Sequence, residues 1–190
     1  MPNTYAARDI EEVDAPRKGI FLVASPSMSD PRFQHTVIVL LSYGENGALG
    51  LIVNRPTNID LAAAIPDLEG GGEKRHRLFF GGPVAMKRIL LLVRSEVALE
   101  SAEHIMGDVY SSADRSVLEQ LLILEKPANT LHLYFGYAGW ASGQLEAEIG
   151  ERSWYLFKAD AAMIFDDEPS TLWRRFMERR RADQIIVWHR

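Results

Sequence analysis

The feature that most constrains the fold is a run of glycine and aromatic residues late in the chain. It reads Gly136-Tyr-Ala-Gly-Trp-Ala-Ser-Gly-Gln-Leu-Glu-Ala-Glu148, follows the apolar segment 131–135, and is followed in turn by Trp154. Glycine accepts positive φ angles and close backbone contacts because it has no Cβ atom. The run therefore predicts a tight aromatic corner between an apolar strand and a short capped segment, with a second aromatic strand beyond it.

Most of the other predicted strands are apolar throughout instead of alternating. Segments 35–43 and 48–55 flank Asn46-Gly47, and Asn-Gly is the strongest short signal for a hairpin. Both segments are continuously apolar at their centres, which indicates that both faces of each strand are covered. Further strands are expected at 19–25, 78–80, 89–94, 108–111, 131–135 and 154–158.

Three segments carry helical signals. Residues 58–68 are expected to form a short helix with Thr57 or Asn58 as its N-cap. Residues 113–126 carry a broad apolar face after the capping Ser112. Ser170 is expected to cap a last helix that ends at residue 180. Residues 144–149 suit either a strand or one turn of helix, and we favour a helix capped by Ser142 and ended by Gly150. Helices separate some strands and not others, so the predicted class is α+β.

The composition indicates a globular chain of 190 residues, with a flexible arm at 1–18 and a single domain at 19–190. It is 47% hydrophobic and contains no cysteine, which excludes disulfides and thiolate chemistry and agrees with a cytoplasmic location. We see neither a signal peptide nor a membrane span and expect a soluble protein. A net charge of −5 argues against a broad nucleic-acid surface.

Four fragments, in order along residues 19–173, resemble the YqgE/AlgH family. They are Gly19 to Phe33, Gly47 to Pro56, Gly81-Gly82-Pro83, and the run Gly136 to Glu148. The resemblance implies a bifurcated mixed sheet folded into a flattened pseudo-barrel with flanking helices. It also implies a regulatory role, because members are often labelled transcriptional regulators. The chain departs from many relatives at Val93, where they carry a histidine, and in its tail from Ile185.

Asp30, Asn54 and Arg55 are the first candidates for a binding site. Asn54-Arg55-Pro56 lies where a buried strand runs into a loop, a place where binding groups are often presented. Arg55 could bind a carboxylate or phosphate. Alternatively, Asn54 accommodates an unusual turn while Arg55 pairs with a nearby acid. We expect Asp30, Asn54 and Arg55 to lie close together at one end of the barrel.

Gly81 and Gly82 are candidates for a ligand contact, although the segment lacks the spacing and the lysine-serine pair of a phosphate-binding loop. We therefore interpret them as a tight turn that permits close backbone contact. Tyr137 and Trp140 could line an apolar pocket, but large aromatic residues are more often core. We expect Trp140 to be a buried anchor.

Gln144, Glu146 and Glu148 with Asp30 could suggest a metal site, because hard cations prefer several carboxylate oxygens. On a helix, however, Gln144 and Glu148 share a face while Glu146 points elsewhere. None of the five histidines lies three or four residues from another, and no Gly-x-Ser-x-Gly motif occurs. We therefore predict no metal, no cofactor and no catalytic residue.

The leading hypothesis is a non-catalytic binding or regulatory protein that acts through an unknown protein or small-molecule partner. The alternative is a hydrolase with Asp30, Asn54, Arg55 and the Gln144/Glu146 segment around one cleft. Direct DNA binding is disfavoured, because the only basic concentration lies on one short helix. Its arginines are Arg174, Arg175, Arg179, Arg180 and Arg181. The sequence gives no indication of the oligomeric state.

Overall fold

The computed structural model describes residues 10–59, 61–65, 76, 78–123 and 130–187. Within them, nine strands form one sheet: β1 Ile20–Ala24, β2 Val37–Gly44, β3 Gly47–Ile52, β4 Leu78–Phe80, β5 Val84–Arg94, β6 Glu103–Met106, β7 Val109–Ser112, β8 Leu131–Trp140 and β9 Trp154–Lys158. The helices are α1 Leu61–Ala64, α2 Arg115–Ile123, α3 Gln144–Gly150, α4 Ala161–Phe165 and α5 Pro169–Val187. The α+β prediction is confirmed.

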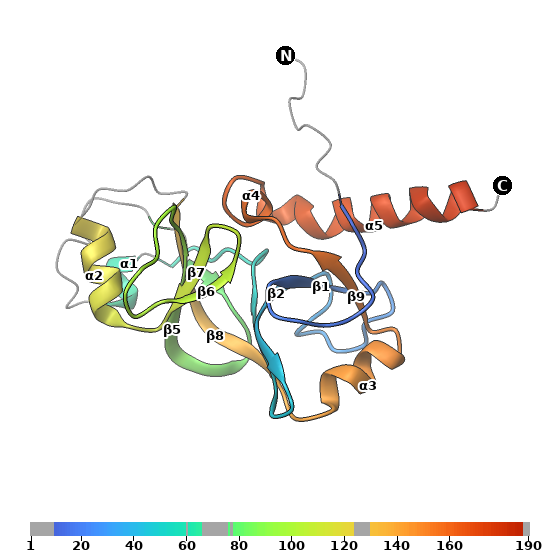
Figure 1. The fold of residues 1–190 in the computed structure, drawn as a ribbon, viewed down its shortest axis with the longest axis horizontal. Coiled ribbons are helices and arrows are strands. Elements are labelled where there is room, and N and C mark those ends of the chain that lie inside the picture. Colours follow the sequence, from blue (N-terminus) through green and yellow to red (C-terminus); the bar gives the residue numbers. More distant parts are fainter. Residues whose placement is uncertain (1–9, 60, 66–75, 77, 124–129, 188–190) are drawn as a thin grey trace, which may run out of the picture.

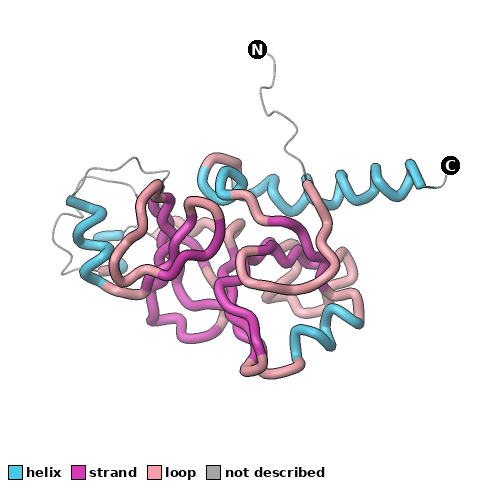
Figure 2. The backbone as a smooth tube through the Cα atoms, in the orientation of Figure 1, coloured by secondary structure: helices cyan, strands magenta, loops and turns pink. Residues whose placement is uncertain are grey.

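The sheet is mixed and forks at β8. Its order is β6-β7-β5-β8-β3-β2-β1-β9, and β4 joins it by pairing with β8 in parallel. The first half of β8 pairs with β4 through Leu133, whereas its second half pairs with β3 through Ala138. The sheet curls into a half-barrel flanked by helices, as Figures 1 and 2 show. The bifurcated sheet that the family resemblance implies is therefore present.

The central strands are buried on both faces, as their continuous apolar runs predict. Along β1, Phe21 and Val23 belong to one buried cluster, while Ile20 and Leu22 belong to a second cluster on the opposite face. Helices α4 and α5 cover the first cluster, and Leu145 of α3 packs in the second. Successive side chains of a strand point to opposite faces, so a strand between two layers must be apolar at every position.

The hairpin predicted at Asn46-Gly47 is confirmed. Gly44 pairs with Gly47 across a two-residue turn, and Gly47 has a φ of 109°. A Cβ atom at Gly47 would lie 2.1 Å from the carbonyl oxygen of Trp140. The hairpin end is thereby brought against the C-terminal end of β8.

The glycine-rich run folds differently from the predicted corner at Gly136. Strand β8 continues through Gly136, which has a φ of 63°, as far as Trp140, and the chain turns only afterwards. Pairing with β3 and β5 offsets the local preference of glycine for a turn. The helical interpretation of residues 144–149 is confirmed as α3, but its N-cap is Gly143 in the left-handed region, not Ser142.

Several boundaries also differ from prediction. Helix α2 starts after Asp114, whose carboxylate accepts from the Ser116 N–H, while Ser112 accepts from the Asp114 N–H. Helix α5 runs on to Val187, and neither β6 nor α4 was expected. Residues 60 and 66–68 of the predicted helix 58–68 lie outside the described residues.

The described part of the N-terminal arm contacts the sheet. The Val13 N–H donates to the Leu156 carbonyl at 3.0 Å, and Glu12 forms a bridge with Phe157 of β9. The Arg180 guanidinium pairs with Glu12 at 3.0 Å and lies 3.7 Å from the ring centre of Tyr155. Across the described residues, no helix is long and apolar enough to cross a membrane.

Candidate functional site

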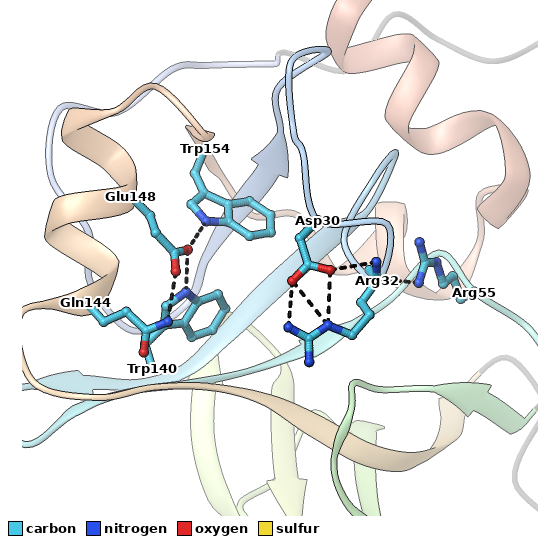
Figure 3. A network of polar contacts seen from close by, with 7 residues as sticks. All are labelled: Asp30, Arg32, Arg55, Trp140, Gln144, Glu148 and Trp154. Atoms are coloured by element: carbon cyan, nitrogen blue, oxygen red, sulfur yellow. Dashed lines mark hydrogen bonds and ion pairs between the residues drawn. The ribbon is translucent and has the colours of Figure 1, made fainter.

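A cavity of about 320 Å³ lies between the loop after β1, the end of β8 and helix α3. We call it the indole pocket, defined by Asp30, Arg32, Phe33, Trp140, Gln144 and Glu148 among its lining residues. In the view of Figure 3, two indole rings lie between Glu148 and the Asp30–Arg32 pair. The pocket therefore has an aromatic wall with fixed polar groups at both sides.

Glu148 organises the α3 side of the indole pocket. Its Oε2 atom accepts hydrogen bonds from the indole Nε1 of Trp140 at 2.9 Å and of Trp154 at 2.7 Å. Its Oε1 atom accepts from Gln144 Nε2 at 2.9 Å, one helical turn earlier. Gln144 also accepts from the Ala141 N–H at 3.0 Å. These bonds join the strand end, the helix start and both indoles in one network.

The aromatic wall extends this network into the core. Trp140 and Trp154 meet edge to face with ring centres 5.9 Å apart, and Phe33 stacks on Trp140 at 6.4 Å. Trp140 is 6% exposed, so the prediction that this indole is buried is confirmed. Aromatic pairs in these geometries are favourable beyond the area that they bury.

Asp30 and Arg32 form the opposite side of the pocket. The Arg32 guanidinium donates to both carboxylate oxygens, at 3.0 Å from Nε to Oδ1 and 2.7 Å from Nη2 to Oδ2. The Arg32 main-chain N–H also donates to Asp30 Oδ1, at 2.9 Å. The hydrogen bonds from Arg32 lower the pKa of Asp30 below its ordinary value.

Asn54 and Arg55 build the loop instead of lining the pocket. Asn54 accepts from the Val37 N–H at 2.8 Å and donates to the His35 carbonyl at 2.9 Å. Arg55 donates to the main-chain carbonyls of Arg32 and of Gln34. Burial lowers the pKa of Arg55, which binds carbonyl groups and not the acid suggested by the sequence. Asp30, Asn54 and Arg55 thus meet around one loop, yet only Asp30 faces the indole pocket.

Gly81 and Gly82 permit a close backbone crossing over β8. A Cβ atom would lie 2.4 Å from the Gly136 oxygen if added to Gly81, and 2.2 Å from the Tyr137 carbonyl carbon if added to Gly82. Gly82 also has a φ of 151°, which L side chains rarely adopt. The crossing explains both glycines structurally, and it places the following Pro83 in the pocket wall.

Glu146 and Tyr137 lie outside the indole pocket. Glu146 accepts a hydrogen bond from the Tyr43 hydroxyl at 2.6 Å, on a different side of α3 from Gln144 and Glu148. This bond lowers the pKa of Glu146 and raises that of Tyr43. Tyr137 is partly buried against the core. Of the groups that the hydrolase hypothesis places around one cleft, Asn54, Arg55 and Glu146 therefore do not line this pocket.

Sequence analysis did not single out Arg32 and considered Glu148 only for a metal site, yet both line the indole pocket. The i, i+4 spacing of Gln144 and Glu148 was a usable signal, because it places both on one helix face. No sequence signal could show that Trp140 and Trp154 share Glu148 as acceptor. Among the described residues, no group of three or more histidine, aspartate or glutamate side chains could hold a metal ion.

These features define an α+β half-barrel protein with a pocket at the end of β8, walled by Trp140 and Gly139 and closed by α3. The AlgH-like family profile matches residues 21–184, and the chain belongs to this family. A UPF0301 protein of Ruegeria pomeroyi is 35% identical over 89% of this chain and 94% of its own length. A UPF0301 protein of Streptomyces coelicolor is 34% identical over 89% of both chains.

Solved structures support the same assignment. The solution structure of the AlgH protein from Pseudomonas aeruginosa is 31% identical and superimposes with a TM-score of 0.70, covering 90% of this chain and 91% of that one. A crystal structure of a protein from Corynebacterium diphtheriae has a TM-score of 0.72 at 22% identity, covering 88% and 89%. The second likeness concerns the fold alone. The names of these proteins give the family and no activity.

Proposed function

We propose that this protein is a non-catalytic binding protein that takes a small molecule or a partner side chain into the indole pocket. The observation that carries the proposal is that polar groups on both sides of the pocket are already held in place by the protein itself. Asp30 is paired with Arg32, and Glu148 accepts from two indoles and an amide. A rigid pocket of this kind loses little entropy on binding.

The same hydrogen bonds argue against acid–base catalysis. Asp30 and Gln144 do meet in the pocket, as the hydrolase alternative requires. Arg32, however, lowers the pKa of Asp30, which makes that carboxylate a weaker base. An efficient catalytic acid or base has a pKa near the working pH. The direction of the shift therefore favours a binding role.

A regulatory role would then act through a bound partner and not through DNA. A phosphate in the pocket would meet the carboxylates of Glu148 and Glu151, which also lines it. On α5, three of the five arginines are engaged in ion pairs: Arg174 with Glu178, Arg175 with Asp167 and Arg180 with Glu12. Neither surface offers the clustered positive field that nucleic-acid binding needs.

The test compares what the wild-type protein and a filled-pocket variant retain from an extract of the native cell. Gly139 lines the pocket and is exposed, and a Cβ atom there would lie 3.3 Å from the end of the Tyr137 ring. The Tyr137 ring must shift by a few tenths of an ångström to admit a side chain there, so a native circular dichroism spectrum of Gly139→Leu is required before its side chain is taken to fill the pocket beside Val84. Gly44→Leu is the matched control, because nothing lies within 4 Å of its Cβ position.

Mass spectrometry should identify a compound or protein that the wild type and Gly44→Leu both retain and that Gly139→Leu does not retain. Amide NMR shifts should place that species at β8 and α3. A retained species that Gly139→Leu binds as well as the wild type would exclude the indole pocket as its site. Turnover of the species by the purified protein would restore the enzyme hypothesis.

A further inference from the structure

A second cavity, of about 340 Å³, opens between α1, α2 and β5, at the other end of the molecule from α3 in Figure 1. None of its lining residues also lines the indole pocket. We propose that this cavity, which we call the α2 cavity, binds an organic anion with an apolar body. Acyl or aryl carboxylates and phosphate monoesters are the ligand class that we have in mind.

The floor of the α2 cavity is apolar. Leu91 of β5 and Leu118 of α2 line it, and each is at most 3% exposed within a buried cluster. Ile65 and Ile89 are partly buried and pack against the same cluster. The floor is therefore the open edge of a packed core layer. An apolar group placed there would be removed from water, which favours binding.

The rim of the α2 cavity is cationic. Lys87 and Arg88 line it, both are exposed, and neither forms an ion pair with any part of the chain that the structure describes. Lys87, Ile89 and Leu91 of β5 all line the cavity. One cation thus lies on the same strand as the two apolar floor residues. This combination matches a ligand with a charged head and an apolar tail.

The remaining charged groups are engaged within α2. Asp114 is the one acid among the residues lining the cavity, and its carboxylate caps α2 by accepting from the Ser116 N–H at 2.8 Å. Arg115 pairs with Glu119 at 2.7 Å. The lining therefore carries three cations and one carboxylate in a chain whose net charge is −5. Such local charge selects anions over cations of equal size.

The volume of the α2 cavity lies at the lower end of the range for small-molecule sites. A ligand of that size must use both the apolar floor and the cationic rim to bind well. We therefore expect the tail and the head to contribute separately. A head group alone or a tail alone should bind poorly.

The experiment titrates the full chain with amphiphiles and follows amide NMR signals. The probes are decanoate and decyl phosphate. One control is decyltrimethylammonium, which has the same decyl chain with a cationic head group. The other two are acetate and inorganic phosphate, which have an anionic head group and no apolar tail. The two tailed anions should shift signals of β5 and the start of α2 in a saturable way. The three controls should bind at least about tenfold more weakly.

Two variants assign the binding to the α2 cavity. Lys87→Gln/Arg88→Gln should weaken decanoate binding about tenfold or more. The matched control Lys158→Gln/Arg174→Gln removes the same charge from exposed positions on β9 and α5, and should bind like the wild type. Ala113→Phe, at an exposed position in the cavity lining, should block binding without unfolding the protein.

Three results would overturn the proposal. The first is equal binding of decyltrimethylammonium, and the second is an equal effect of the two double variants. The third is an absence of saturable shifts around β5 and α2. Gly139→Leu should bind decanoate normally, so a failure of the indole pocket proposal would leave this result unaffected.

Discussion

Trp140 and Trp154 donate their indole N–H groups to the same carboxylate oxygen, Oε2 of Glu148, at 2.9 Å and 2.7 Å. The two rings come from β8 and β9, which are not neighbours in the sheet, and the acceptor comes from the helix between them. One carboxylate therefore fixes the relative position of two strands and a helix. The integrity of the indole pocket depends on this junction.

Trp140→Ala should lower the free energy of unfolding by about 3–5 kcal/mol, because it leaves a cavity beside Phe33 and Trp154 and removes a donor from Glu148. Urea denaturation measures the change. Trp140→Phe keeps most of the ring volume and should cost clearly less. A stability of Trp140→Ala equal to that of the wild type would show that the indole is not a packing anchor.

Glu148→Ala should destabilise the fold by about 2–4 kcal/mol, since two indole N–H groups lose their acceptor in a part-buried site. Glu146→Ala is the matched control on the same helix. It removes one hydrogen bond to Tyr43 at an exposed position and should cost less than about 1 kcal/mol. If the two substitutions cost the same amount, the shared acceptor has no special role.

The Asp30 carboxyl should titrate below its ordinary value of 3.8, because Arg32 stabilises the ionised form. A group with a lowered folded-state pKa stabilises the protein above its unfolded-state pKa, and this contribution is lost as pH falls through the folded-state pKa. The loss is therefore expected in the acid range below about pH 4. Side-chain carboxyl ¹³C shifts measure the titration, and Arg32→Gln should return its midpoint towards the ordinary value.

Gly82→Ala should destabilise the protein by roughly 1–3 kcal/mol or more, because its new Cβ atom would lie 2.2 Å from the Tyr137 carbonyl carbon. Thermal unfolding followed by circular dichroism measures the effect. Gly44→Ala, whose Cβ would meet nothing within 4 Å, should leave the melting temperature nearly unchanged. A melting temperature of Gly82→Ala close to that of the wild type would mean that the crossing over β8 relaxes easily.

Short duplex DNA should bind weakly and without sequence preference, with dissociation constants of about 10⁻⁶ M or weaker. The reason is the net charge of −5 together with the engagement of Arg175 and Arg180 in ion pairs. Fluorescence anisotropy at physiological salt, with several unrelated duplexes, measures this. Tight binding to one sequence would overturn the expectation.

The predictions from sequence were most accurate where the signal was local or repeated along a strand. The apolar runs of β2 and β3 predicted strands covered on both faces, and Asn46-Gly47 predicted their hairpin. The caps were less accurate, since Gly143 and Asp114 begin α3 and α2 where Ser142 and Ser112 were expected. Several nearby side chains can cap a helix, and tertiary contacts decide which one does.

The candidate site was predicted only in part. The sequence alone determined the strands, the α+β class and the family, because these depend on periodicity, turn residues and short motifs. Only the tertiary structure decided that β8 continues through Gly136, that Arg55 binds loop carbonyls, and that Glu148 faces the pocket while Glu146 does not. Each of these depends on which segments meet across the sheet, and hydrogen bonds between residues far apart in the chain leave no local pattern in the sequence.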